Sequence, residues 1–88
     1  MDAKQKLTLM DKILREFDDI KNSQTSVLKK ISQVEAENIN LDVALLNDEL
    51  PAIHEEIDAT IQKITALQEQ FSDHRNEFAK DNPVTDTQ

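Results

Sequence analysis

The chain has 88 residues, enough for one domain with a small core. It contains no Gly, Cys, Trp or Tyr, and its formal net charge is −8. Without Gly, the turns that join the strands of a sheet are hard to form, whereas the plentiful residues are mostly good or neutral helix formers. The composition therefore predicts an all-α fold. The lack of Cys excludes disulfides, a thiolate nucleophile and a zinc–thiolate site.

The charge is unevenly distributed along the chain. Residues 1–34 have a net charge of +2, whereas residues 35–58 contain eight acids and no base. Nucleic acids and anionic membranes bind Lys and Arg clusters, so we expect neither as a partner. No apolar run approaches the ~18 residues of a membrane span, and the amphipathic N-terminus does not resemble a signal peptide. We therefore expect a cytoplasmic protein and leave secretion without a leader open.

Residues 3–46 carry a heptad pattern typical of a coiled-coil helix. Nine of the eleven positions are apolar, and the two exceptions are the amides Gln24 and Asn38. A buried amide in such a pattern specifies register and oligomeric state, so we expect this role for both. This first heptad series consists of Met10, Phe17, Gln24, Ile31, Asn38 and Leu45 at a, with Ile13, Ile20, Val27, Val34 and Leu41 at d.

A second heptad series predicts a second helix over residues 50–80. Its phase does not continue the first, and Pro51 lies at the break, where Asn47 or Asp48 could cap a new helix. We therefore predict a helical hairpin over residues 1–80, with a turn at 47–50 and a flexible tail at 81–88. The second series consists of Leu50, Ile53, Ile57, Thr60, Ile64, Leu67, Phe71, His74 and Phe78.

A three-helix bundle is the alternative fold. Residues 21–26, with the sequence KNSQTS, are weak helix formers, and a turn there would give helices at 4–21, 26–47 and 51–79. The heptad phase runs through this segment without a break, which favours one long helix.

Two apolar clusters are predicted to bind partners. The first arm of the hairpin would be longer than the second, which leaves an uncovered overhang that contains Leu7, Met10 and Leu14. A lone hairpin also has little core, so we expect a homo-oligomer that completes a bundle, or insertion into a partner's bundle. The second cluster lies off the first heptad series, near the predicted turn, and consists of Ile39, Val43 and Leu46. Because acids surround it, its partner should present Lys or Arg at the rim of the contact.

The sequence offers no pattern for catalysis. We find no glycine-rich phosphate loop, no nucleophile–base arrangement and no metal-type spacing, so we expect no enzyme activity, cofactor or metal. His54 and Asp58 lie one helical turn apart, which is most simply a surface contact. His74 falls in the second heptad series, where a residue at the core edge and a pH-sensing group are both open.

The hairpin and the length resemble the small helical-hairpin secretion substrates, and also small secretion chaperones and adaptor subunits. The likeness is one of architecture: the Trp-x-Gly turn and the Tyr-x-x-x-Asp/Glu tail signal of those substrates are absent. We therefore predict a non-enzymatic coiled-coil interaction protein, an adaptor, chaperone or assembly subunit that binds partner helices through its apolar series. The alternative is an acidic inhibitor whose residues 35–58 imitate nucleic acid and block a nucleic-acid-binding protein.

Overall fold

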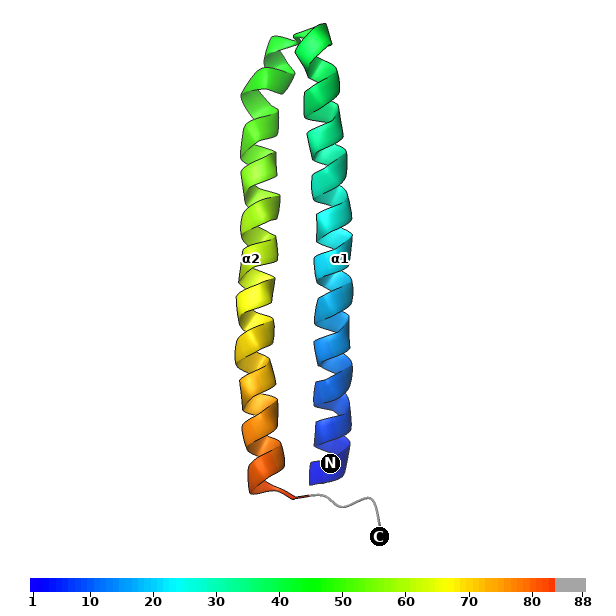
Figure 1. The fold of residues 1–88 in the computed structure, drawn as a ribbon, viewed down its shortest axis with the longest axis vertical. Helices are drawn as coiled ribbons and strands as arrows, with labels where there is room; N and C mark the ends of the chain where they lie inside the picture. The colour runs from blue at the N-terminus through cyan, green and yellow to red at the C-terminus, as the bar shows by residue number, and fades with distance from the viewer. Residues whose placement is uncertain (84–88) are drawn as a thin grey trace.

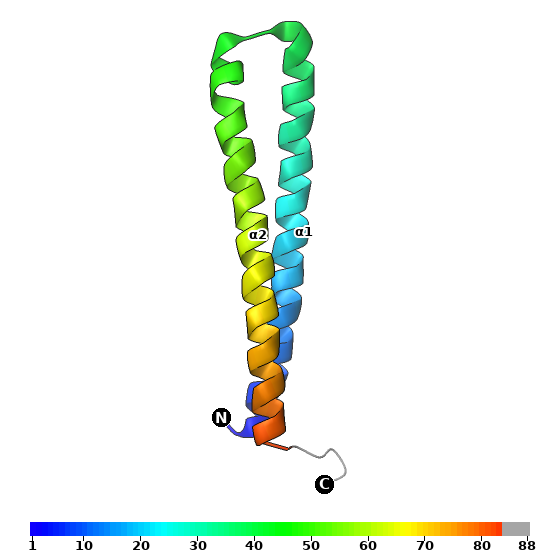
Figure 2. The ribbon, with the colours of Figure 1, turned by 60° about the vertical axis from the view of Figure 1, so that its left-hand side comes forward.

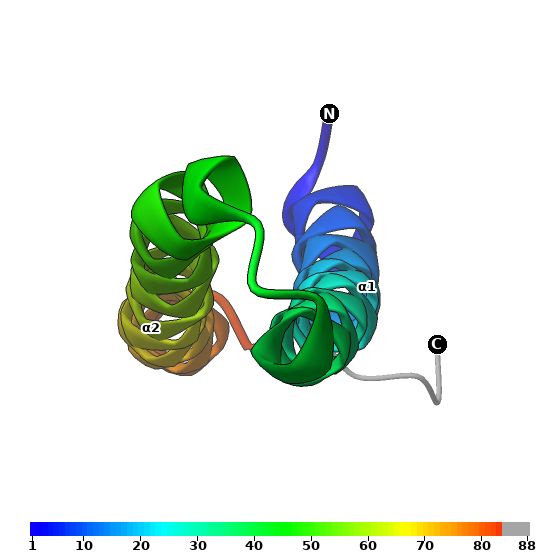
Figure 3. The ribbon, with the colours of Figure 1, turned by 90° about the horizontal axis from the view of Figure 1, so that it is seen from above.

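The computed structural model describes residues 1–83, which form two long α-helices packed as an antiparallel hairpin. Helix α1 spans Ala3–Leu41 and helix α2 spans Ala44–Asp81. Figures 1 and 2 show the two helices side by side along their whole length, in a rod of 65 × 18 × 16 Å. Seen from above the turn, α1 and α2 lie next to each other, joined by the turn (Figure 3). The predicted all-α hairpin is confirmed.

Helix α1 begins with a capping box and runs unbroken to the turn. The Asp2 carboxylate accepts the backbone N–H of Gln5 at 2.8 Å, and the Gln5 side chain accepts the N–H of Asp2 at 2.9 Å. Residues 21–26 are helical throughout, so the three-helix alternative is wrong. Their low propensity amounts to a few tenths of a kcal/mol per residue, and contacts with α2, such as that between Lys21 and Gln68, outweigh it.

The turn consists of Asp42 and Val43 and lies earlier than the predicted turn at 47–50. Asp42 adopts the left-handed conformation, with φ 53° and ψ 49°. Asp tolerates this region better than most residues, so a chain without Gly still makes a tight helix–helix turn. The predicted arms 3–46 and 50–80 are corrected accordingly. The predicted caps Asn47 and Asp48 lie inside α2, and Pro51 lies beyond its first turn.

The early turn makes the two arms equal, at 39 and 38 residues, so the predicted overhang does not exist. Leu7, Met10 and Leu14 are half-buried between the helices. Near the N-terminus, the Lys6 ammonium lies 5.9 Å from the centre of the Phe78 ring. The expectation that these three leucine and methionine side chains remain bare for a partner was wrong, because α2 reaches back to cover them.

Each helix turns a narrow row of residues toward the other, with successive members four and three residues apart. The inner row of α1 includes Phe17, Lys21, Gln24, Leu28 and Ile31, and that of α2 includes Ile57, Ile61, Ile64, Gln68 and Phe71. The a positions from Met10 to Asn38 are therefore inward, as predicted, whereas Leu45, the last predicted a position, lies in α2 and is 66% exposed. The d positions Ile20, Val27, Val34 and Leu41 are not, since all four are exposed. Among residues 1–83, only Asn38 and Leu50 are buried, with 4% and 8% of their surface exposed.

Helix α2 ends at Asp81, and the backbone N–H of Asn82 caps it by donating to the Phe78 carbonyl at 2.9 Å. The first residue of the predicted tail is therefore helical. Residues 84–88 of that tail lie outside the described residues.

Candidate partner-binding surface

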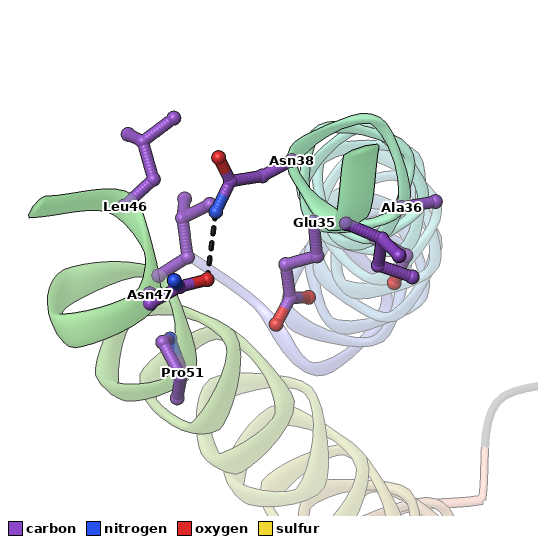
Figure 4. A pocket seen from close by; sticks show the side chains of 9 residues that line it. Glu35, Ala36, Asn38, Leu46, Asn47 and Pro51 are labelled. Carbon is purple, nitrogen blue, oxygen red and sulfur yellow. Dashed lines mark hydrogen bonds between the residues drawn. The ribbon is translucent and has the colours of Figure 1, made fainter. Parts of the chain in front are cut away.

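Asn38 organises the turn end of the hairpin from a buried position, with 4% of its surface exposed. Its side-chain oxygen accepts the backbone N–H of Val43 at 2.9 Å, and its amide nitrogen donates to the Asn47 side-chain oxygen at 2.8 Å (Figure 4). The Asn47 amide in turn donates to the Asp42 carboxylate at 2.9 Å. These bonds tie the turn and the start of α2 to the end of α1, although no side chain caps the first turn of α2. The proposed role of Asn38 in oligomer specificity stays a prediction.

A groove of about 430 Å³ lies beside this network, between the ends of the two helices (Figure 4). Ile39 and Leu46, two of the three predicted tip residues, line it together with Ala36 and Pro51. Ile39 is the more open of the two, with 77% of its surface exposed. Val43 lies in the turn itself and is not part of the groove wall. The structure thus brings two of these three residues together, in an open and shallow setting.

Polar pairs cross between the helices at several levels. His54 Nδ1 lies 2.7 Å from a Glu35 carboxylate oxygen. Gln68 accepts a hydrogen bond from Lys21 at 2.8 Å and donates to Asp18 at 2.7 Å. These pairs, together with the edge-on contact of the Phe17 and Phe71 rings at 6.0 Å, fix the register of the two helices.

The last polar pair lies at the open end of the hairpin, where Arg75 donates to the Asp11 carboxylate at 2.8 Å and 3.3 Å. This hydrogen bond, and then the charge of Asp11, raise the pKa of the Arg75 guanidinium. The pair is close to solvent, so we expect a small contribution to stability.

The d residues of both helices lie on one side of the hairpin. In a helix, residue i+3 lies about 60° to one side of residue i, and residue i+4 about 40° to the other. Gln24 and Leu28 point toward α2, so Val27, three residues after Gln24, lies on the flank of α1. Ile64 and Gln68 point toward α1, so Leu67, three residues after Ile64, lies on the flank of α2. The helices are antiparallel, so equal rotations bring both flanks to the same side.

We call this side the apolar face. Its side chains recur every seven residues along both helices, and those of α1 stand level with those of α2. Exposure is 40% at Ile20, 42% at Val27 and 48% at Leu67, which is unusual for large aliphatic side chains in a regular row. The face consists of Ile13, Ile20, Val27, Val34 and Leu41 from α1, with Leu46, Ile53, Thr60, Leu67 and His74 from α2.

The opposite side, the polar face, carries small and charged residues. The bonds of Gln68 with Asp18 and of Arg75 with Asp11 lie along it. Its members are Asp11, Asp18, Thr25 and Ser32 from α1, with Thr65, Ser72 and Ala79 from α2. The hairpin is therefore two-sided over its middle part, where Ile20, Val27, Val34, Ile53 and Leu67 are exposed on the apolar face. At the turn end, Ile39 continues the series of the polar face and is also exposed.

The remaining predicted site residues take modest places. Gln24 is half-buried between the helices. His74 is exposed on the apolar face, level with Ile13, and its ring stacks on Phe71 at 6.1 Å. Its pH-sensing role stays a prediction. Of the apolar face, the sequence analysis named only Leu46 as a binding residue. The other nine belong to one or other of the heptad series, and the sequence did not show which residues beside the a positions would point inward.

Within residues 1–83, the structure holds no cluster of three or more His, Asp or Glu side chains that could bind a metal. Neither helix of this part of the chain is apolar enough over a sufficient length to cross a membrane. Compared with protein-family models, with curated proteins and with solved structures, the chain matches none of them.

Proposed function

We propose that this protein is a non-enzymatic coiled-coil interaction module, an adaptor or assembly subunit that binds helices through its apolar face. One observation carries the proposal: a row of aliphatic side chains stays exposed from Ile20 to Leu41 of α1, with Ile53 and Leu67 of α2 beside it, although each helix already has an inner row packed against the other. Contiguous apolar surface of this extent marks an interaction site in soluble proteins.

The geometry of the face favours a helical partner. Its side chains repeat every seven residues along each of the two helices, so they form two rows side by side. A helix with its own heptad repeat can insert side chains between such rows over several turns, as in helix bundles. An extended strand or an irregular loop has no matching period. The partner surface is therefore one or more amphipathic helices.

The acidic end of the hairpin adds a charge requirement. Six of the eight acids in residues 35–58 lie in α2 or the turn, and most have exposed side chains. A partner that extends past this end should carry Lys or Arg there, which would speed association more than it lengthens the lifetime of the complex.

A photo-crosslinking experiment in cells tests this proposal. A photoreactive amino acid replaces Val27 on the apolar face in one variant, and Thr25 on the polar face in the matched control. The two positions are two residues apart in the same helix, so expression and folding should be equal. We expect discrete crosslinked products from position 27 alone, with the attachment sites mapping to a helical segment of a partner or of the protein itself.

Two results would contradict the proposal. Equal labelling from positions 25 and 27 would show that the apolar face has no special role. Crosslinks to a nucleic-acid-binding protein from a third variant, labelled at Glu55 in the acidic end, with none from position 27, would instead support the inhibitor that imitates nucleic acid.

A further inference from the structure

We infer that the apolar face binds a second copy of this chain, with the two hairpin turns at opposite ends of a four-helix bundle. The inference rests on the proposed function and names the partner of the same face. Three features of the chain support it: the spacing of the layers on the face, the distribution of charge along the hairpin, and the area available.

The layers of the face match those of a second copy turned end for end. Along α1, Ile13 and Val34 lie equally far from the midpoint between Ile20 and Val27. A two-fold axis at this midpoint, perpendicular to the helices, places Ile20 of one copy opposite Val27 of the other.

The same axis also places the members of α2 in layers. It sets Leu67 opposite Thr60 of the second copy, and His74 opposite Ile53. Each of the four resulting layers then contains four side chains, three of them aliphatic; the fourth is Thr60 in the central layers and His74 in the outer ones. All neighbouring helices in this bundle are antiparallel, as in four-helix bundles with short loops.

The charge distribution selects this arrangement over the one with both turns together. Residues 35–58 carry eight acids and no base, so two such segments side by side would repel. The end-for-end arrangement instead places this segment beside residues 1–12 and 69–83 of the other copy. That end contains five bases and six acids, a net charge of −1, so it repels the acidic segment far less than a second segment with eight acids and no base would. The five bases are Lys4, Lys6, Lys12, Arg75 and Lys80.

The end layers fit this arrangement as well. Leu41 and Leu46, at the turn end of the apolar face, come opposite Lys6 and Asp81 of the second copy. The aliphatic stem of Lys6 can cover a leucine while its ammonium group stays near the carboxylates around the turn. Lys6 already lies over the Phe78 ring, which holds its stem close to the hairpin.

The area is sufficient for a stable dimer. The hairpin measures 65 Å by 18 Å in the plane of its two helices. A face of this size offers on the order of 1,000 Å² per copy, compared with about 800 Å² per partner in a stable interface. Both copies would use the same patch, as a two-fold dimer requires.

Sedimentation equilibrium on the full chain gives the first test. We expect a mass twice the 10.1 kDa of one chain at micromolar concentrations. The double variant Ile20→Lys, Leu67→Lys should weaken dimerisation by roughly 100-fold or more, because it places charges at the centre of the interface. Both side chains are exposed in the single hairpin, so helicity should persist. The control Thr25→Lys, Ser32→Lys adds the same charge to the polar face and should dimerise normally.

Disulfide trapping tests the orientation, since the chain has no natural Cys. Ser23 lies between Ile20 and Val27 on the apolar side of α1, next to the proposed axis. In the Ser23→Cys variant, Cys at position 23 of one copy should therefore form a disulfide with Cys at position 23 of the other. A disulfide requires Cα atoms within about 7 Å, and the proposed axis brings these two positions together. Thr25→Cys, at the same level on the polar face, should remain reduced.

The opposite orientation predicts a different pairing. With both turns together, α1 faces α2 of the second copy, so Ser23→Cys would pair with Lys63→Cys in a mixture and not with itself. That result would overturn the proposed orientation. Raising the ionic strength from about 0.1 M to about 1 M, where the Debye length falls from ~10 Å to ~3 Å, would then strengthen the dimer, whereas we expect no such gain.

A monomer at all concentrations would overturn the second copy as the occupant. Crosslinks from position 27 to a helix of another protein would still support the proposed function in that case. If a dimer formed but the Ile20→Lys, Leu67→Lys variant retained it, the apolar face would not be the interface. The two proposals therefore fail on different observations.

Discussion

Replacing Asn38 by Ala should destabilise the hairpin by a measurable and local amount. The substitution removes two well-formed hydrogen bonds, to the Val43 N–H at 2.9 Å and the Asn47 side chain at 2.8 Å. At about 1 kcal/mol each, their loss costs about 2 kcal/mol. The better helix propensity of Ala returns about 0.5 kcal/mol. The expected net loss is about 1.5 kcal/mol, which lowers Tm by roughly 6–12 °C in a chain of this length.

Thermal melting followed by circular dichroism measures this loss, and amide hydrogen exchange shows where it arises. The Val43 N–H should exchange faster in the variant, because its acceptor is gone. All samples should have the same protein concentration, since association makes Tm depend on concentration. The control is Gln24→Ala, which removes the other amide of the first heptad series from a half-buried position and should cost under about 1 kcal/mol.

The reasoning would be refuted if the Asn38→Ala variant melted at or above the temperature of the wild type with unchanged exchange at Val43. Asn38 would then serve as the sequence pattern first suggested, as a polar residue that lowers stability and specifies the assembly. A fall in Tm accompanied by a wider range of masses would show that it has both roles.

Three further perturbations test other parts of the hairpin. Asp42→Val should cost about 1–2 kcal/mol, because a β-branched residue fits the left-handed region poorly, whereas Asp42→Gly should be close to neutral; equal melting temperatures for the two would contradict the turn. Ser23→Pro should cost about 3 kcal/mol, and its tolerance in a thermal melt would indicate a break in α1. A double-mutant cycle of Arg75→Met and Asp11→Asn in urea should give a small favourable coupling that high salt removes; a coupling insensitive to salt would argue against an exposed ion pair.

The position of the turn shows how far local signals reach in this chain. Sequence reasoning placed it at 47–50, because the phase break, Pro51 and two capping residues coincide there. The chain turns at Asp42–Val43 instead. Each local signal was compatible with a helix start, but the bonds of Asn38 to residues nine or fewer positions later stabilise the earlier turn. No single residue type announces such a network.

The prediction of the candidate site depended on the position of the turn as well. Moving the turn made the arms equal, which covered Leu7 and Leu14 and removed the predicted overhang. The orientation of each helix about its own axis leaves most of the d residues exposed. Neither local propensity nor heptad spacing could show that these residues would form an exposed face. On α1, the row that contains Leu28 and the row that contains Val27 were both apolar enough to pack against α2.

The sequence by itself determined the all-helical class and the concentration of acid near the turn, and its unbroken heptad phase favoured two helices over three. Composition without Gly, heptad spacing and charge counts are properties of the chain alone, and they act through backbone propensity and periodicity. Only the tertiary structure decided which apolar row is covered and which is left for a partner. That choice is made by pairs far apart in the chain, such as His54 with Glu35 and Gln68 with Lys21. Their geometry exists only once two helices lie against each other, since no residue within one helix can show which neighbour it will face.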